Sequence, residues 1–246
     1  MDADEGLGRL RALGFAEADA QELWAHFDGA EQRGKQGHGH ARIGWLEGLE
    51  GYDPSAEPTL LEEEIGLQRW HGGGAIGYLV LGRVVRAQLE RPPAHARLVV
   101  CERTFPTGML GHHVRRLAEG GLVGVLTATS PRRLGHPSGG PKLAGTNPLA
   151  IGIPSSTGDP IVTDVSMGAI TWGDVVAGLA GEDELVPFGG EQAHKAFALA
   201  LGLQLLVDSL VRDEGHGAVM LVARPEADPV PALRKLAAGV RLPGDR

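Results

Sequence analysis

The chain has 246 residues, 42% of them hydrophobic and 22% charged, which is the composition of a folded globular protein and not of a disordered one. Its formal net charge of −8 gives no overall positive field for nucleic acid or an anionic membrane surface, so a small-molecule ligand is the better expectation. Cys101 is the only cysteine, which excludes an internal disulfide and fits a reducing cytoplasm.

The amino terminus carries no sign of export. Its sequence, MDADEGLGRL, is acidic where a signal peptide would be basic and then apolar. We also find no apolar stretch of the length that spans a bilayer. We therefore expect a cytoplasmic protein without a membrane partner.

The N-terminal part is predicted to be helical around a polar turn rich in histidine. Apolar side chains recur at helical spacing over residues 5–14 and 16–32. The turn RGKQGHGHAR follows at 33–42, and a new apolar pattern over 43–49 stops at the turn-like sequence GYDP. We assign residues 1–70 to this N-terminal helical part.

The middle of the chain alternates between strands and helices. The segment 130–148 is nearly all Pro, Gly, Ser, Arg and Lys, and it is the loop in which we expect a site. We assign residues 71–190 to one α/β domain. The predicted elements are helices over 75–90 and 109–119, strands over 96–102 and 122–129, and a strand pair over 149–154 and 160–166.

The C-terminal part is predicted as helix, strand and helix, over 191–211, 216–224 and 228–240. We expect residues 191–246 to pack back on the N-terminal part. Because strands and helices alternate along the whole chain without strict βαβ regularity, the fold class is a layered α/β or α+β fold.

The run Gly72–Gly77 satisfies the pattern G-x-G-x-x-G and precedes a predicted helix, as a pyrophosphate loop would. The preceding sequence EIGLQRWH does not read as a strand, which a Rossmann loop requires. We therefore interpret the run as a chance match in a glycine-rich chain.

His38 and Arg42 lie in one short turn and form the strongest candidate pair for chemistry. An imidazole that titrates near neutrality can move a proton, and a guanidinium can hold a carboxylate with two hydrogen bonds. This pairing suits 2-substituted acids as substrates. A solvated basic turn without function is the alternative.

A metal site is the weaker interpretation of the histidines, because no HExxH, CxxC or carboxylate partner accompanies them. We therefore expect no bound metal. The histidines considered are His38, His40, His112, His113 and His136.

Other polar residues lie where predicted elements begin or end. Thr146 and Asn147 occupy a turn at the mouth of a strand, where they can orient a ligand or only shape the turn. Asp164 ends an apolar strand and can orient a histidine or cap the next element. Lys195 enters an apolar helix, from which it can reach a phosphate or lie at the surface.

Taken in order, these fragments resemble the signature of one family. RGKQGHGHAR is similar to R-G-x-x-S-H-G-x-x-R, GGPKLAGTNPLAIGIP to a G-G-x-x-x-x-x-G-T-N-P loop and strand, and RLPGDR to a C-terminal L-P-G-E-R. GGGAIG, GLVGVLTATS, TDVS and HKAFALAL agree as well. The chain thus resembles the malate/L-lactate dehydrogenase-like family, which includes sulfolactate and ureidoglycolate dehydrogenases and Δ1-piperideine-2-carboxylate reductases.

The resemblance implies a layered non-Rossmann NAD(P)-binding fold, with a mixed sheet flanked by helices and a helical subdomain from the N- and C-terminal parts. Residues 71–190 would be the cofactor-binding-like domain, and the protein a homodimer. The activity implied is an NADPH- or NADH-dependent oxidoreductase for a small 2-oxo, 2-hydroxy or cyclic 2-imino acid, placed in a specialised biosynthetic pathway.

The resemblance also implies residue roles. His38 would be the acid/base group, and Asp164 would orient it or line the nicotinamide pocket. The substrate would contact Arg42, Thr146 and Asn147, whereas the cofactor would contact Ser130, Val165, Ser166 and Lys195.

The chain departs from the family pattern at three places. Gly37 stands where the family has a serine, Pro106 stands where it has a second histidine, and the segment 173–187 is short. These departures keep two alternatives open. One is a cofactor-independent isomerase, cyclase or lyase on the same fold, and the other is a non-catalytic partner subunit.

Overall fold

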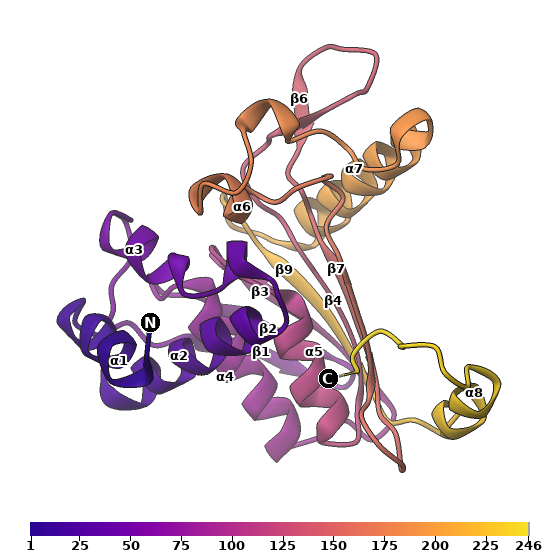
Figure 1. Ribbon diagram of the computed structural model, residues 1–246. Coiled ribbons are helices and arrows are strands. Elements are labelled where there is room, and N and C mark those ends of the chain that lie inside the picture. The colour runs from indigo at the N-terminus through magenta and orange to yellow at the C-terminus, as the bar shows by residue number, and fades with distance from the viewer. Residues whose placement is uncertain (246) are drawn as a thin grey trace.

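The computed structural model describes residues 1–245 and has a seven-stranded mixed sheet at its centre (Figure 1). Strands β2 and β3 run parallel, and all other neighbouring strands of this sheet run antiparallel. The predicted mixed sheet flanked by helices is therefore confirmed. In their order across the sheet, the strands are β1 (Thr59–Glu64), β2 (Leu67–His71), β3 (Ala96–Glu102), β9 (Ala218–Ala223), β4 (Val123–Ala128), β7 (Leu149–Ile153) and β8 (Ile161–Val165).

Helices and a small ribbon surround this sheet. The ribbon pairs β5 (Leu134–Gly135) with β6 (Lys142–Ala144), both inside the loop that we left without structure. The helices are α1 (Ala3–Ala12), α2 (Glu17–Gln32), α3 (Ala41–Glu47), α4 (Gly77–Glu90), α5 (Leu110–Glu119), α6 (Trp172–Val176), α7 (Ala193–Leu210) and α8 (Val230–Leu236). Three short 3-10 turns are η1 (Gln36–His38), η2 (Glu182–Glu184) and η3 (Gly190–Gln192).

Three layers form the body of the molecule. Helices α4 and α5 bury apolar side chains such as Val84 and Leu117 against the strands, in a core that includes Leu126 and Met220. Helices α1 to α3 form a second core above them, which closes on Tyr78 of α4. The sequence folds this way because each helix has one apolar side, which must be covered by a neighbouring layer.

The C-terminal part joins the central sheet, and it meets residues 1–70 where Arg69 Nη1 donates to the Leu210 carbonyl oxygen (2.7 Å). Strand β9 lies between β3 and β4 at the centre of the sheet, and α7 and α8 lie toward opposite ends of it (Figure 1). Five of the six residues of β9 are buried or partly buried. Ala218, Met220 and Val222 of this strand face the core, whereas Leu221 on its other face is 42% exposed.

Strands β1 and β2 were missed by the sequence reading. The pattern of β2 is obscured because one of its buried positions is the polar residue Gln68. Its side chain is fully used, since it accepts hydrogen bonds from Trp70 Nε1 (3.2 Å) and Gln88 Nε2 (2.7 Å) and donates one to Glu63 (2.7 Å). A buried glutamine with these partners is compatible with a strand, although the sequence does not reveal the partners.

The glycine run after β2 therefore does connect a strand to a helix, contrary to our reading. The space beside these glycines is nevertheless occupied by other parts of the protein. A Cβ atom at Gly77 would lie 2.6 Å from the Pro106 carbonyl oxygen and 2.8 Å from the Phe105 nitrogen. The glycines thus allow the chain to approach itself closely, and they leave no room for a pyrophosphate at this helix end.

Helix α7 corrects the expectation that no apolar stretch is long enough to span a bilayer. The segment 190–210 is long and apolar enough to cross a membrane by length and composition, with a mean hydropathy of 1.2. A core helix of a soluble protein meets the same criteria. Here Ala196 and Ala200 are buried, and the helix packs on β4, β6 and β9.

Candidate active site

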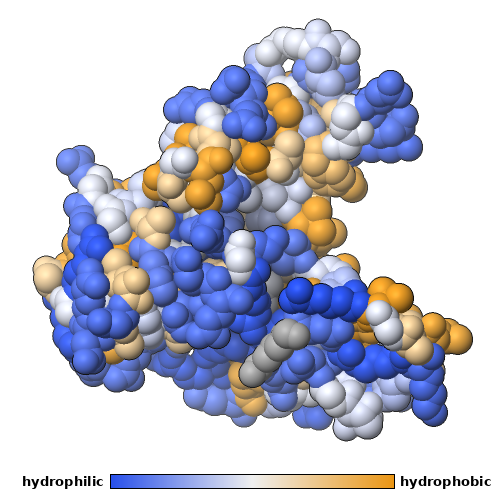
Figure 2. Space-filling model, viewed as in Figure 1, coloured by the Kyte–Doolittle hydropathy of each residue, from blue (hydrophilic) through white to orange (hydrophobic). Residues whose placement is uncertain are grey.

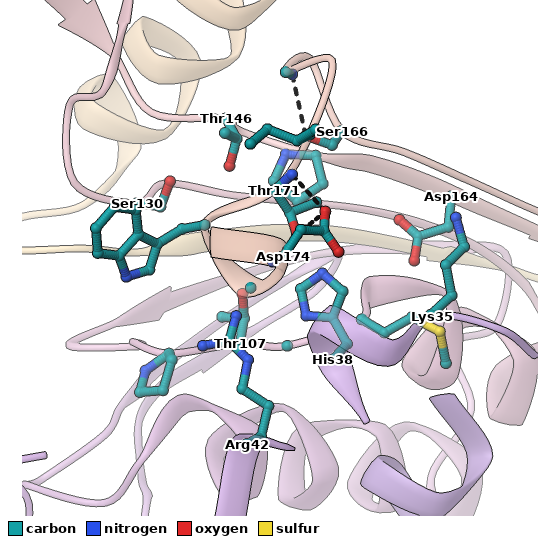
Figure 3. Close-up of a pocket in the computed structure, with 18 of the residues that line it drawn as sticks. Lys35, His38, Arg42, Thr107, Ser130, Thr146, Asp164, Ser166, Thr171 and Asp174 are labelled. Carbon is teal, nitrogen blue, oxygen red and sulfur yellow. Dashed lines mark hydrogen bonds between the residues drawn. The ribbon is translucent and has the colours of Figure 1, made fainter. Parts of the chain in front are cut away.

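A pocket of about 450 Å³ lies where the N-terminal helices face one edge of the sheet (Figure 3). We name its two sides after their origin. The turn wall consists of Lys35, His38 and Arg42 with Thr171–Asp174 of the α6 region. The strand-end wall consists of Ser130, Thr146, Asp164, Val165 and Ser166.

The register of the sheet brings the strand-end wall together. Leu149 of β7 pairs with Thr127 of β4 and with Val165 of β8. Because both pairs are antiparallel, the end of β4, the start of β7 and the end of β8 meet at one edge. Polar residues just beyond these strands therefore converge, although they are far apart in sequence.

His38 is partly buried at the end of η1, and its side chain faces the pocket. Its Nδ1 atom is buried and receives no hydrogen bond from the described residues. Burial, assisted by the positive charge of Arg42, lowers the pKa of His38 to about 3. The imidazole is therefore neutral near pH 7 and is available as a hydrogen-bond partner for a bound molecule.

Arg42 lies in the first turn of α3 and is only 6% exposed. Its Nε atom donates to the Gly37 carbonyl oxygen (2.8 Å), and its guanidinium lies 4.8 Å from the centre of the Trp45 ring. These contacts hold the side chain in one orientation beside His38. The remaining guanidinium nitrogens are suited to a carboxylate in the pocket.

Asp164 lines the same pocket, and among the described residues no hydrogen bond joins its carboxylate to His38 Nδ1. Its Oδ2 atom accepts a hydrogen bond from the Gly111 nitrogen (2.7 Å) in the first turn of α5. Burial raises the pKa of Asp164 to about 6, although this hydrogen bond acts in the opposite direction. The start of a helix offers free amide groups, and these compete with the histidine for the carboxylate.

Asn147 is not a pocket residue, contrary to the substrate-binding role predicted for it. It is fully buried, and its Nδ2 atom donates to the Ala200 carbonyl and to Gln204 Oε1, both at 3.0 Å. Its Oδ1 atom accepts from the Ser130 nitrogen (3.3 Å). Asn147 thus fastens the strand ends to α7 and positions Ser130, whereas Thr146 beside it faces the pocket.

The other predicted cofactor contacts divide into two groups. Val165 and Ser166 line the pocket at the end of β8, and Ser166 Oγ accepts from the Gly168 nitrogen (3.1 Å). Lys195 is exposed on α7 and lines neither this pocket nor a neighbouring one of about 700 Å³. The apolar side of α7 faces the sheet, which turns Lys195 away from the site.

Sequence reasoning missed the residues of the short segment after β8. Thr171, Trp172 and Asp174 line the pocket, and the guanidinium of Arg133 lies 3.8 Å from the centre of the Trp172 ring. One signal was available. The spacing of Thr171 and Asp174 is that of a capping box, which marks the start of a helix.

The histidines considered for a metal site are spread over the molecule. His40 stacks on Trp24 and lies 3.1 Å from Asp28, and His136 contacts Phe197. His112 and His113 pack against the His26 ring. The Nε2 atom of His26 accepts a hydrogen bond from the Met109 nitrogen (3.0 Å). Within residues 1–245, no three His, Cys, Asp or Glu side chains are placed to hold a metal ion.

Comparison with known proteins places these features in context. The family model for malate/L-lactate dehydrogenase matches residues 7–183. A Δ1-pyrroline-2-carboxylate reductase from Pseudomonas fluorescens is 29% identical over 188 residues, which are 65% of this chain and 54% of that protein. A Δ1-pyrroline-2-carboxylate/Δ1-piperideine-2-carboxylate reductase from Pseudomonas aeruginosa is 30% identical over 235 residues, 83% of this chain and 69% of the relative.

Solved structures show the same fold. The Δ1-piperideine-2-carboxylate reductase from Pseudomonas syringae pvar. tomato superposes with a TM-score of 0.80 at 22% identity, over 98% of this chain and 89% of that one. The sulfolactate dehydrogenase from Methanocaldococcus jannaschii gives a TM-score of 0.74 at 18% identity, over 94% and 79%. The chain is nevertheless short, since its matches span between about half and two thirds of the first curated relatives.

Proposed function

The chain belongs to the malate/L-lactate dehydrogenase family, and from this premise we propose that it is an NAD(P)H-dependent reductase acting at C2 of a small 2-oxo or cyclic 2-imino acid. The observation that carries the proposal is the pairing of His38 and Arg42 in one pocket, opposite the hydroxyl groups of the strand-end wall. An acid/base group and a carboxylate-binding group on one side leave the other side for a nicotinamide.

Among these substrates, the state of His38 favours cyclic imino acids. Reduction of a ketone requires a proton donor, and His38 is neutral near pH 7 because burial and Arg42 lower its pKa to about 3. An imine nitrogen is far more basic than a ketone oxygen and can carry its proton before the hydride arrives. A neutral imidazole can then accept a hydrogen bond from that N–H group, while Arg42 binds the carboxylate at C2.

The pocket fits a nicotinamide on its own geometry. The hydroxyl groups of Ser130, Thr146 and Ser166 are suited to a carboxamide, and Val165 offers an apolar contact to a ring. A volume of about 450 Å³ is within the usual range for small-molecule sites. When bound, the reduced nicotinamide supplies the hydride.

Two cations are candidates for the phosphates of the cofactor in place of Lys195. Lys35 lines the pocket and also the neighbouring one, and Arg133 lines it from the loop after β4. Both lie on segments that reach the pocket, whereas Lys195 does not. A positive charge from Lys35 or Arg133 would bind the pyrophosphate, which would otherwise face only the carboxylates of the pocket.

The proposal is tested with purified protein, NADPH or NADH, and four substrates: pyruvate, oxaloacetate, and the five- and six-membered cyclic 2-imino carboxylic acids. We expect nucleotide binding by calorimetry and oxidation of the nucleotide with the cyclic imino acids. The absence of nucleotide binding would overturn the proposal. Conversion of a substrate by nucleotide-free protein would instead favour an isomerase, cyclase or lyase, the alternative that the departures at Gly37 and Pro106 keep open.

We also infer that the protein is a homodimer. Leu199, Leu205 and Leu206 on α7 are 54%, 59% and 45% exposed, and apolar side chains gather over α6 and α7 in the space-filling view (Figure 2). Exposed apolar patches of this kind support association with another chain. Sedimentation equilibrium should give twice the mass of the chain, and a monomer at micromolar concentration would contradict this inference.

A further inference from the structure

Gly37, which precedes His38, contacts α6 through its backbone. A Cβ atom at position 37 would lie 2.6 Å from the Asp174 nitrogen and 2.8 Å from the Gly173 carbonyl carbon. Gly173 makes the reciprocal contact, because a Cβ atom there would lie 2.8 Å from the Gly37 carbonyl carbon. Any side chain at either position would push α6 away from η1, so the two glycines are what allow α6 to reach the histidine.

This contact places the carboxylate of Asp174 beside His38. Its Oδ2 atom accepts hydrogen bonds from the nitrogen and the hydroxyl of Thr171, both at 2.8 Å. Its Oδ1 atom lies over Gly37, in the space that a side chain at this position would fill. Figure 3 shows the carboxylate directed toward the imidazole of His38, whereas Asp164 lies to the side.

His38 has the unpaired atom that such a carboxylate can satisfy. Its Nδ1 atom is buried without a partner among the described residues, and Asp164 is held by Gly111. The charge of Asp174 acts on the pKa of His38 in the direction opposite to burial and Arg42. The charged and titratable groups around His38 are Lys35 before η1, Arg42 on α3, Asp174 on α6, Asp164 on β8 and His26 on α2.

We propose that Asp174 is a positioning residue for His38: when substrate binds, its carboxylate accepts a hydrogen bond from one imidazole nitrogen and fixes the tautomer of the neutral ring. This rests on the proposed function. Hydrogen bonds of catalytic groups often shorten only in the complex with substrate. With one ring nitrogen donating to Asp174, the other faces the substrate and can accept a hydrogen bond from the protonated imine nitrogen.

The central test is the variant Asp174→Asn, which preserves shape and can still accept from Thr171. Without this carboxylate the His38 ring is free to take the other tautomer, so kcat at neutral pH should fall by about 10- to 1000-fold. KM for NADPH should change by less than about threefold, since cofactor contacts are retained. Nitrogen-15 NMR of the His38 ring, in nucleotide-free protein saturated with a cyclic 2-imino carboxylic acid, should show a changed tautomer balance, and Asp174→Glu should recover part of the rate.

Glu184→Gln is the matched control. Glu184 also caps a short turn in this segment, by accepting from the Gly181 nitrogen (2.9 Å), but it lies outside the pocket. If Asp174→Asn behaves like this control in both rate and NMR, the proposal is overturned. If the His38 signal changes but the wild type reduces no substrate, the pairing stands and the proposed function fails.

A folding defect is separated from loss of the pairing by the second variant. If Asp174→Asn does not fold, Asp174→Glu keeps the charge and moves the carboxylate by one methylene group. The His38 signal should then differ from the wild type. An unchanged signal in a folded Asp174→Glu protein would overturn the proposal.

Discussion

The two walls of the pocket are built by different means. The strand-end wall follows from sheet register, and hydrogen bonds of a buried amide fix it, as Asn147 ties Ser130 to α7. The turn wall depends on close backbone contact, because α6 can approach η1 this closely only when positions 37 and 173 carry no side chain, as in Gly37 and Gly173. The comparison teaches that sheet register alone aligns one wall of the pocket, whereas the other wall needs two positions without a side chain.

The largest effect should come from the turn wall, through His38. We expect His38→Ala to lower kcat by about 10²–10⁴-fold, because the ring that contacts the substrate nitrogen is lost, while nucleotide binding persists because the strand-end wall is intact. Steady-state kinetics and calorimetry measure the two quantities. His40→Gln is the control, since His40 stacks on Trp24 outside the pocket and should leave kcat within about twofold. Loss of nucleotide binding in His38→Ala would contradict the assignment of nucleotide binding to the strand-end wall alone.

Arg42 tests whether the turn wall binds the carboxylate of the substrate. Arg42→Lys keeps the charge but loses the two parallel hydrogen bonds, so KM for the substrate should rise by about 10- to 100-fold. The change is measured at saturating nucleotide. Arg9→Lys, in an exposed pair with Glu47, is the matched control. Equal KM values for the substrate in Arg42→Lys and Arg9→Lys would show that Arg42 does not bind the substrate carboxylate.

A substitution behind the strand-end wall should lower the free energy of unfolding. Gln204→Leu leaves Asn147 Nδ2 with one fewer acceptor and the Gly145 nitrogen without its partner. Loss of buried hydrogen-bond partners costs about 1–3 kcal/mol in the free energy of unfolding, measurable by urea denaturation. Gln21→Leu, at an exposed position of α2, should change it by less than about 0.5 kcal/mol. A stable Gln204→Leu protein with full nucleotide affinity would show that the amide does not fix this wall.

The smallest effect concerns the pH dependence of stability at Asp164. Its pKa in the folded protein is raised to about 6, so the folded state holds a proton that the unfolded chain releases near the ordinary pKa of 3.8. The stabilisation from its neutral form is therefore complete below the unfolded pKa and is lost as the pH rises through about 6.

Asp164→Asn removes this titration and can still accept from Gly111. Relative to the wild type, the variant should gain up to about 2 kcal/mol in free energy of unfolding between about pH 4 and about pH 7. Urea denaturation at several pH values measures the difference. A constant difference would mean that Asp164 is ionised in the fold as it is in the unfolded chain.

Much of the fold followed from the sequence, and its failures have physical causes. The helices α2, α4 and α5 and the strands β3, β4 and β9 were predicted to within a few residues, because their apolar residues recur with regular spacing. Strand β2 was missed because Gln68 is buried with partners that lie elsewhere in the chain. The place of β9 between β3 and β4 could not be predicted, because strand order is a long-range property.

The site shows the same limit. The resemblance placed His38, Arg42, Thr146 and Ser130 in one pocket, and the structure brings them together. It gave no sign that the Asn147 amide donates to Gln204, or that Lys195 lies outside the pocket. Such outcomes depend on which groups compete for each hydrogen bond in three dimensions, and spacing in the sequence does not contain that information.

The central claim is hydride transfer to C2 in the pocket of His38 and Arg42. Its most direct test uses NADPH and NADH that carry deuterium at C4 of the nicotinamide, with a cyclic 2-imino acid as substrate. We predict a product with one deuterium at C2, detected by mass spectrometry and NMR, and almost none from His38→Ala. Product that forms without nucleotide, or that carries no deuterium at C2, would contradict the account.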